Sequence, residues 1–147
     1  MTRVAAIDCG TNSVRLLVAD AERKEDGSIY LKDLTRQMRI VRLGQGVDKT
    51  GRLDPAAIDR TIDAIVEYER MISRLGATAT RFVATSASRD AENRDDFVAA
   101  VREVLNIEPE VVEGTEEASL SFTGAVSGLG AGATAPMLVV DIGGGST

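Results

Sequence analysis

The sequence contains no histidine and a single cysteine, Cys9. Without histidine the chain has no Ser-His catalytic triad and no histidine acting as a general acid. The usual zinc sites are also excluded, because they need histidine or several cysteines. Any acid–base chemistry must therefore use carboxylates, lysine, tyrosine or water. One cysteine excludes a disulfide within the chain, and we expect Cys9, which lies among apolar residues, to be a core residue rather than a reactive thiol.

Long apolar runs are also missing, since none approaches the roughly 20 residues that a membrane helix needs. The first residues lack the apolar stretch and cleavage site of a signal peptide, so we expect a cytoplasmic protein with no membrane partner. The net charge of −6 argues against nucleic acid as a partner, because cationic contacts to phosphates dominate that binding. A phosphate ligand would have to be held by backbone N–H groups, metal ions and a few arginines.

The length of 147 residues and the hydrophobic content of 44% predict one domain with a real core. A helix is predicted from Asp54 and Pro55, an N-cap residue and a residue favoured at the first helical position, to Gly76, a natural C-cap. Two more helices are predicted at 93–105 and 115–126. The glycine-rich segments 44–51 and 128–136 are predicted to be loops.

Alternation and apolar runs predict strands, and a tight turn between the first two indicates a hairpin. After the third strand, helices alternate with strands, which favours right-handed parallel crossovers. The expected fold class is therefore α/β, a mixed sheet with three N-terminal antiparallel strands followed by parallel strands and flanking helices. The predicted strands are 3–8, 14–19, 29–43, 80–84, 110–113 and 137–142.

Two segments far apart in the chain repeat one local pattern. Residues 4–11 and 137–144 each consist of an apolar strand, an aspartate, an apolar residue and a glycine turn. Such a turn offers free N–H groups to phosphate oxygens, and the aspartates, Asp8 and Asp141, can hold a divalent cation. Two such units that face each other would clamp a phosphate chain. Each aspartate taken alone is also an ordinary turn former.

Four segments together resemble the exopolyphosphatase and guanosine pentaphosphatase family. Residues 8–13 and 141–147 look like the two phosphate motifs of the actin, sugar-kinase and heat-shock ATPase superfamily. Residues 84–91 resemble a strand-to-helix junction of the narrower family, and residues 114–118 resemble its Gly-x-Glu-Glu-Ala segment. The resemblance implies a ribonuclease-H-like (actin-like ATPase) domain, here the N-terminal domain of a longer enzyme whose second lobe is absent, and a homodimer in the full-length protein.

The resemblance also implies a function and residue roles. It implies Mg²⁺-dependent hydrolysis of a terminal phosphoanhydride, releasing orthophosphate from polyphosphate or guanosine pentaphosphate. Glu117 would be the base that activates water, and Asp8 and Asp141 would be the carboxylates beside the metal. The implied phosphate-binding residues are Asn12, Ser13, Arg89, Gly143, Gly144, Gly145 and Ser146.

Other interpretations stay open at the level of sequence. Glu116 and Glu117 are acids of a kind favoured at any helix N-terminus, and we keep that interpretation for Glu116. Arg89 could instead be a solvated side chain or a partner of Asp90 or Asp95. A kinase or ATPase of the same superfamily, or a non-catalytic alarmone-binding module, would share the phosphate loops without this hydrolysis.

Overall fold

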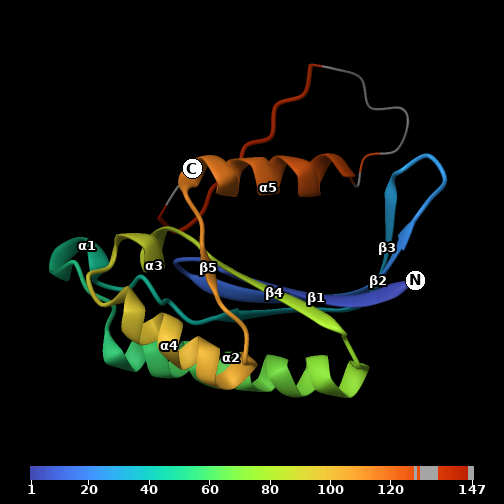
Figure 1. Cartoon of the computed structure of the whole chain (residues 1–147). Coiled ribbons are helices and arrows are strands. Elements are labelled where there is room, and N and C mark those ends of the chain that lie inside the picture. Colours follow the sequence, from blue (N-terminus) through green and yellow to red (C-terminus); the bar gives the residue numbers. More distant parts are fainter. Residues whose placement is uncertain (128, 130–135, 146–147) are drawn as a thin grey trace.

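The structure, a computed structural model, describes residues 1–127, 129 and 136–145. A five-stranded sheet lies between two layers of helices, with α2 and α4 on one face and α5 on the other (Figure 1). The elements are β1 (Thr2–Cys9), β2 (Ser13–Arg23), β3 (Ile29–Ile40), α1 (Val47–Thr50), α2 (Pro55–Leu75), β4 (Ala79–Ala84), α3 (Ser86–Asp90), α4 (Arg94–Leu105), β5 (Glu110–Val111) and α5 (Gly114–Ser127).

The strand order is β3-β2-β1-β4-β5. β1 pairs antiparallel with β2, and β2 pairs antiparallel with β3. β4 pairs parallel with β1, and β5 pairs parallel with β4. The predicted α/β class and the change from antiparallel to parallel pairing are confirmed. The parallel pairing brings the carboxyl ends of β1 and β4 to the same edge of the sheet.

The core lies between the sheet and the layer formed by α2 and α4. Alternate strand residues, such as Ile7 and Val14, point into this layer, and Ile65 of α2 and Phe97 of α4 meet them there. The Tyr68 hydroxyl, also fully buried, donates a hydrogen bond of 3.0 Å to the carbonyl of Val14. Cys9 is buried in the same core, and burial raises the pKa of its thiol, which fits a packing role.

The predicted cap residues at both ends of the longest helix, α2, are confirmed. The Asp54 side chain accepts a hydrogen bond from the Ala56 N–H at 3.0 Å, and Pro55 occupies the first turn. Gly76 ends α2 with a positive φ of 71°. A side chain would strain this left-handed conformation, and glycine avoids that penalty.

The predicted strand at 137–142 is wrong, because this segment has no strand structure. A strand needs a neighbour to take its backbone hydrogen bonds, and no described strand pairs with this segment. Its apolar side chains remain open, with Leu138 88% and Ile142 78% exposed. Local alternation predicted an extended conformation here, but the pairing that makes a strand is not local.

Smaller differences concern element ends. The third strand stops at Ile40, three residues before the predicted end, and the short helix α1 lies within the predicted loop 44–51. The fifth strand has two residues, and the one-turn helix α3 was not predicted. Most of the predicted loop 128–136 lies outside the described residues.

Candidate active site

The turn between β1 and β2 forms one wall of the site. The Gly10 N–H donates to the Ser13 carbonyl at 3.0 Å, which closes the turn. The Asn12 carbonyl accepts hydrogen bonds from two successive N–H groups after β3, and the Thr11 carbonyl accepts one from Gly44 at 2.8 Å. The chain after β3 therefore fixes the turn, so that Asn12 and Ser13 are presented on a rigid support.

The glycine segment Gly143–Gly145 forms the facing wall. A Cβ atom at Gly145 would lie 2.6 Å from the Thr11 Oγ1 and 2.9 Å from the Ser86 Oγ. These two hydroxyls are joined by a hydrogen bond of 2.8 Å. The two loops approach so closely that only glycine fits without movement. Ser146, the last predicted phosphate-binding residue, lies outside the described residues.

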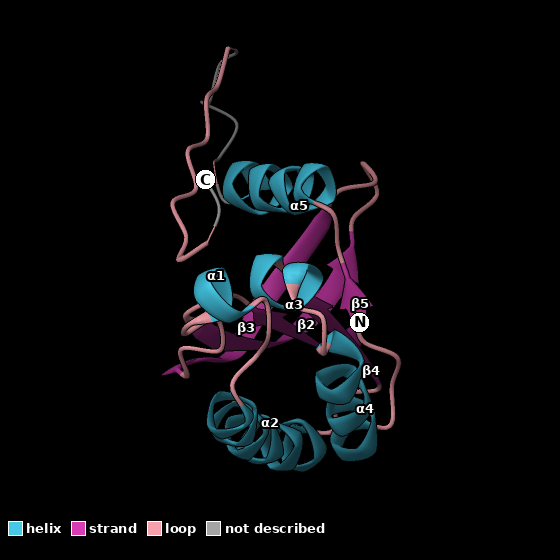
Figure 2. Ribbon diagram, turned by 90° about the vertical axis from the view of Figure 1, so that its left-hand side faces the viewer, coloured by secondary structure: helices cyan, strands magenta, loops and turns pink. Residues whose placement is uncertain are grey.

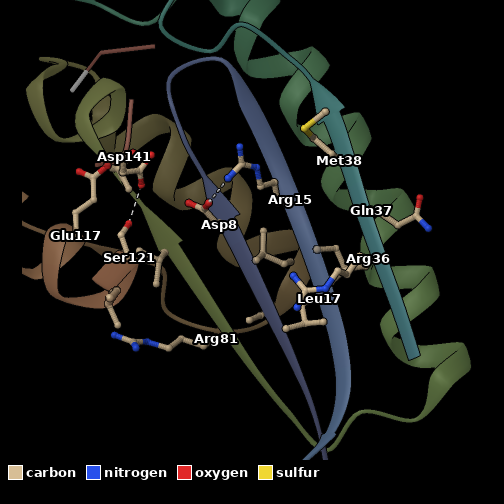
Figure 3. Close-up of a pocket in the computed structure, with 16 residues that line it drawn as sticks. Asp8, Arg15, Leu17, Arg36, Gln37, Met38, Arg81, Glu117, Ser121 and Asp141 are labelled. Atoms are coloured by element: carbon tan, nitrogen blue, oxygen red, sulfur yellow. Dashed lines mark hydrogen bonds and ion pairs between the residues drawn. The ribbon is translucent and has the colours of Figure 1, made fainter. Parts of the chain in front are cut away.

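Three carboxylates line the space between these loops. A cavity of about 330 Å³ is lined by both loops and by Asp8, Glu117 and Asp141. Figure 3 shows Glu117 and Asp141 close together, with Asp8 facing them from β1. Asp141 also accepts a hydrogen bond of 2.8 Å from the Ser121 hydroxyl, one helical turn beyond Glu117 on α5. The structure thus brings together the residues that the sequence singled out at three distant positions.

The electrostatics of the cavity raise the pKa of Asp8. The largest cause is burial, which disfavours the charged form. Arg15 opposes this effect, while the negative charges of Glu117 and Asp141 raise the pKa further. Arg15 lies directly opposite Asp8 across the hairpin, with its Nη1 3.8 Å from the Asp8 Oδ2. An added cation would relieve the crowding of negative charge.

Glu117 is held by Arg89 from the neighbouring helix α3. The Arg89 Nη1 lies 3.7 Å from the Glu117 Oε2, and the two side chains are 18% and 23% exposed. The same nitrogen donates to the Val112 carbonyl at 3.1 Å, and the Arg89 Nε contacts Asp90. Arg89 is therefore not a solvated side chain, and its predicted contact with phosphate stays a prediction.

The donor set of the cavity suits a hard cation. Mg²⁺ is usually bound through one or two carboxylates together with waters and phosphate oxygens, and Asp8 and Asp141 supply two carboxylates on one cavity. Within the described ranges, no group of three or more His, Cys, Asp or Glu residues is arranged to hold a metal ion. The residues present thus fit a cation that shares its coordination with substrate better than a closed protein site.

The sequence interpretation missed Arg15, Ser121 and the Thr11–Ser86 contact. Arg15 lies directly opposite Asp8 in the hairpin of β1 and β2. Residues directly opposite each other in an antiparallel pair of strands face the same side of the sheet. Ser121 lies four residues after Glu117, which on a helix means the same side. Either periodicity could have found these residues. The Thr11–Ser86 contact joins residues 75 positions apart and has no such local signal.

A second, wider cavity of about 620 Å³ continues from the site between α5 and the sheet (Figure 3). It is lined by Asp8 and Arg15 at the site end, and by Met38, Arg81 and Leu120 farther along. Arg81 forms an ion pair with Glu116, the neighbour of Glu117, at 3.3 Å. This contact agrees with a structural role for Glu116.

Comparison with known sequences gives a consistent match. A family model described as the Ppx/GppA phosphatase family matches residues 20–147. The chain is 53% identical to exopolyphosphatase 2 of Mycobacterium tuberculosis over 156 aligned residues, which cover 100% of this chain and 47% of that protein. It is 38% identical to a guanosine-5'-triphosphate,3'-diphosphate pyrophosphatase of Aeromonas hydrophila over 143 residues, covering 97% of this chain and 27% of that protein.

Solved structures agree with this match. An exopolyphosphatase-like protein superposes with a TM-score of 0.80 at 45% identity, covering 88% of this chain and 38% of that one. The predicted actin-like ATPase type of fold is therefore confirmed. The chain spans about half the length of the Mycobacterium relative, or less for the other proteins compared. No helix in the described part of the chain is both long and apolar enough to cross a bilayer.

Proposed function

The chain belongs to the Ppx/GppA phosphatase family, and on this premise we propose that it is the N-terminal ribonuclease-H-like domain of a longer enzyme. The proposed activity is hydrolysis of terminal phosphoanhydride bonds, with release of orthophosphate from inorganic polyphosphate, guanosine pentaphosphate or both. The names of the Mycobacterium and Aeromonas relatives support these two substrates.

One observation carries the proposal: both glycine loops and three carboxylates line a single cavity. Hydrolysis of a phosphoanhydride needs positioning, neutralisation of charge and an oriented water more than covalent help from the protein. The backbone N–H groups of Asn12, Ser13 and residues 143–146 would bind the phosphate oxygens. Arg15 and Arg89 would supply the nearby positive charge.

Glu117 would act as the general base. Arg89 holds its carboxylate beside the cavity, where it can accept a proton from a water placed against the terminal phosphorus. The water oxygen would form a bond to the terminal phosphorus, its proton would move to a carboxylate oxygen of Glu117, and the bond from that phosphorus to the leaving phosphate oxygen would break. General base catalysis of this kind contributes about 10²–10⁴-fold to a rate.

We propose Mg²⁺ as the cofactor, held by Asp8 and Asp141. When bound, it would neutralise charge on the phosphate oxygens. The crowding of Asp8 by two other carboxylates supports a cation at this place, since two carboxylates on one cavity repel each other without one.

Phosphate release by the full-length protein tests the proposal. Glu117→Gln keeps the shape of the side chain and removes the base, so kcat should fall about 10²–10⁴-fold with little change in substrate binding. Glu116→Gln, one residue earlier and paired with Arg81, is the matched control and should retain most activity.

Both substrates should be assayed without an acceptor molecule. Turnover that requires an acceptor would replace the proposal with a kinase. Tight nucleotide binding without turnover, unaffected by Glu117→Gln, would replace it with a binding module.

A further inference from the structure

The Thr11 side chain lies between three glycines from two other loops. A Cβ atom at Gly44 would overlap the Thr11 Cγ2 methyl group. A Cβ atom at Gly144 would lie 3.3 Å from the Thr11 Cβ, and one at Gly145 would lie 2.6 Å from the Thr11 Oγ1. Thr11 therefore fills the space in which the β1–β2 turn, the chain after β3 and the segment 143–145 approach one another.

The need for glycine at these positions comes from packing. Gly44, Gly144 and Gly145 do not have the positive φ that disfavours other residues, so their backbone conformation does not by itself require glycine. The space that a side chain would need is already taken by Thr11. The close approach of the loops is therefore set by the size and direction of one side chain.

Ser86 fixes the direction in which the Thr11 side chain points. The two hydroxyl groups are joined by a hydrogen bond of 2.8 Å, and Ser86 is 4% exposed. Threonine branches at Cβ, so rotation about χ1 moves its hydroxyl and its methyl group together between staggered positions. Because Ser86 holds the hydroxyl, the methyl group is also held against Gly44.

Ser86 is itself held at the carboxyl ends of β1 and β4. The N–H of its neighbour Thr85 donates to the Cys9 carbonyl at 3.1 Å. The Thr85 carbonyl accepts hydrogen bonds from the N–H groups of Ser88 and Arg89. α3 follows β4 at this end of the sheet, which faces the viewer in Figure 2. The Ser86 hydroxyl is therefore a fixed point to which the β1–β2 turn is tied.

We propose that Thr11 is the spacer that sets the distance between the turn at residues 10–13 and the segment 143–145, and that Ser86 is the positioning residue that holds this spacer. This role depends on the proposed binding of phosphate by these two segments. Hydrogen bonds weaken steeply away from their best distance and angle. N–H groups on two separate loops therefore bind one phosphate chain well only at one separation, which the spacer maintains.

The two hydroxyl groups act as one unit rather than as two separate ligands. A hydroxyl group has one proton to donate, and one of the two protons is used in the bond between Thr11 and Ser86. Loss of either hydroxyl breaks the same bond, so loss of both should weaken ligand binding no more than loss of one. This non-additivity distinguishes a spacer from two independent phosphate contacts.

Titration calorimetry of the full-length protein tests the spacer. The ligand is methylenediphosphonate with Mg²⁺, a pyrophosphate analogue that is not hydrolysed. Thr11→Val, which keeps the shape of the side chain, and Ser86→Ala should each raise the dissociation constant about three- to tenfold, the effect of one hydrogen bond. The double variant T11V/S86A should show a similar rise. Unchanged binding in both single variants, or a multiplied loss in the double variant, overturns the proposal.

Thr61→Val is the matched control. Thr61 is fully buried on α2, and its hydroxyl donates to the Ala57 carbonyl at 2.7 Å. The substitution removes the same group from the same type of residue, so it should lower stability and leave the dissociation constant unchanged. Thermal unfolding of each variant separates loss of binding from loss of the fold. A control that weakens binding as much as Ser86→Ala overturns the positioning role.

Movement of a methyl group tests the spacer by shape alone. Gly44→Ala adds a methyl group where the Thr11 Cγ2 lies, so it should raise the dissociation constant. Thr11→Ser removes that methyl group and keeps the hydroxyl. The double variant G44A/T11S should therefore bind the analogue more tightly than Gly44→Ala alone and nearly as well as the original chain. A double variant that binds no better than Gly44→Ala would refute the spacer.

Phosphate release separates this proposal from the proposed function. Ser86→Ala should raise KM more than it lowers kcat, because it acts on binding, whereas Glu117→Gln should do the reverse. A protein that binds the analogue but releases no phosphate would refute the proposed hydrolysis and leave the spacer standing. A protein that does not bind the analogue, or a Ser86→Ala variant with a lower kcat at unchanged KM, overturns the spacer.

Discussion

Neighbouring residues on β1 and β2 meet opposite conditions on the two faces of the sheet. Ile7 and Val14 point toward α2 and α4 and are 1% and 0% exposed. Asp8 and Arg15, each the next residue along, point toward α5 and line the candidate site. One face is closed by apolar packing, and the other is left open for polar and charged groups.

The comparison teaches that the core and the site are built from the same strands. Because side chains alternate with a period of two, burying Ile7 and Val14 fixes the direction of Asp8 and Arg15. A register slip of one residue would exchange the two sets. The packing of the core face thus positions the charged residues that these two strands contribute to the candidate site.

Phe82→Ala should have the largest effect on the free energy of unfolding, and it tests the contrast between the two faces of the sheet. Phe82 is fully buried and packs against Phe97, with ring centroids 6.4 Å apart. Its truncation should lower the free energy of unfolding by about 3–5 kcal/mol, measured by urea denaturation. Val83→Ala, on the next residue and the opposite face, is the control, with an expected loss of about 1 kcal/mol or less. Equal losses would show that both faces carry the fold.

Tyr68→Phe should have the next largest effect. The lost hydroxyl leaves the buried Val14 carbonyl without its 3.0 Å hydrogen bond, which should lower the free energy of unfolding by about 1–3 kcal/mol. The exposed Tyr30 provides the comparison, since Tyr30→Phe should change stability by no more than about 0.5 kcal/mol. Thermal and urea unfolding of both variants measures the two losses, and equal losses would contradict this expectation.

Asp8→Asn should have the smallest effect on stability, and the opposite sign. Burial and two neighbouring carboxylates raise the pKa of Asp8 in the folded chain, so the ionised carboxylate favours the unfolded state. The Asn variant should therefore be the more stable protein at pH 7. The difference should shrink as the pH falls from the raised pKa of the folded chain toward the ordinary carboxyl pKa of about 3.9, and it should be lost below that pH.

Urea unfolding at pH 7 and at pH 3.5 measures this difference. The effect is small because the Asp8 side chain is 55% exposed, and solvent screens its charge. A variant that is less stable at pH 7 would mean that Asp8 serves the core rather than the site. On the site face, stability is given up at a charged residue that lines the cavity.

The sequence by itself determined the features that depend on neighbouring residues. The cap at Asp54, the end of α2 at Gly76, the hairpin of β1 and β2, and the paired glycine motifs all follow from local propensity and spacing. The shared fold of the solved relatives agrees with what these local patterns predicted. Local patterns also predicted the side of the sheet to which each strand side chain points, once the apolar residues of the strand were assigned to the core.

Only the tertiary structure decided which distant residues meet. It brought Arg89 to Glu117, joined Thr11 to Ser86 across 75 positions, and placed Glu117 and Asp141 near Asp8. It also left residues 137–142 unpaired by any described strand, although their pattern is that of a strand. Hydrogen bonds between strands and contacts between loops depend on chain segments whose separation in sequence carries no periodic signal, so no local rule could have predicted them.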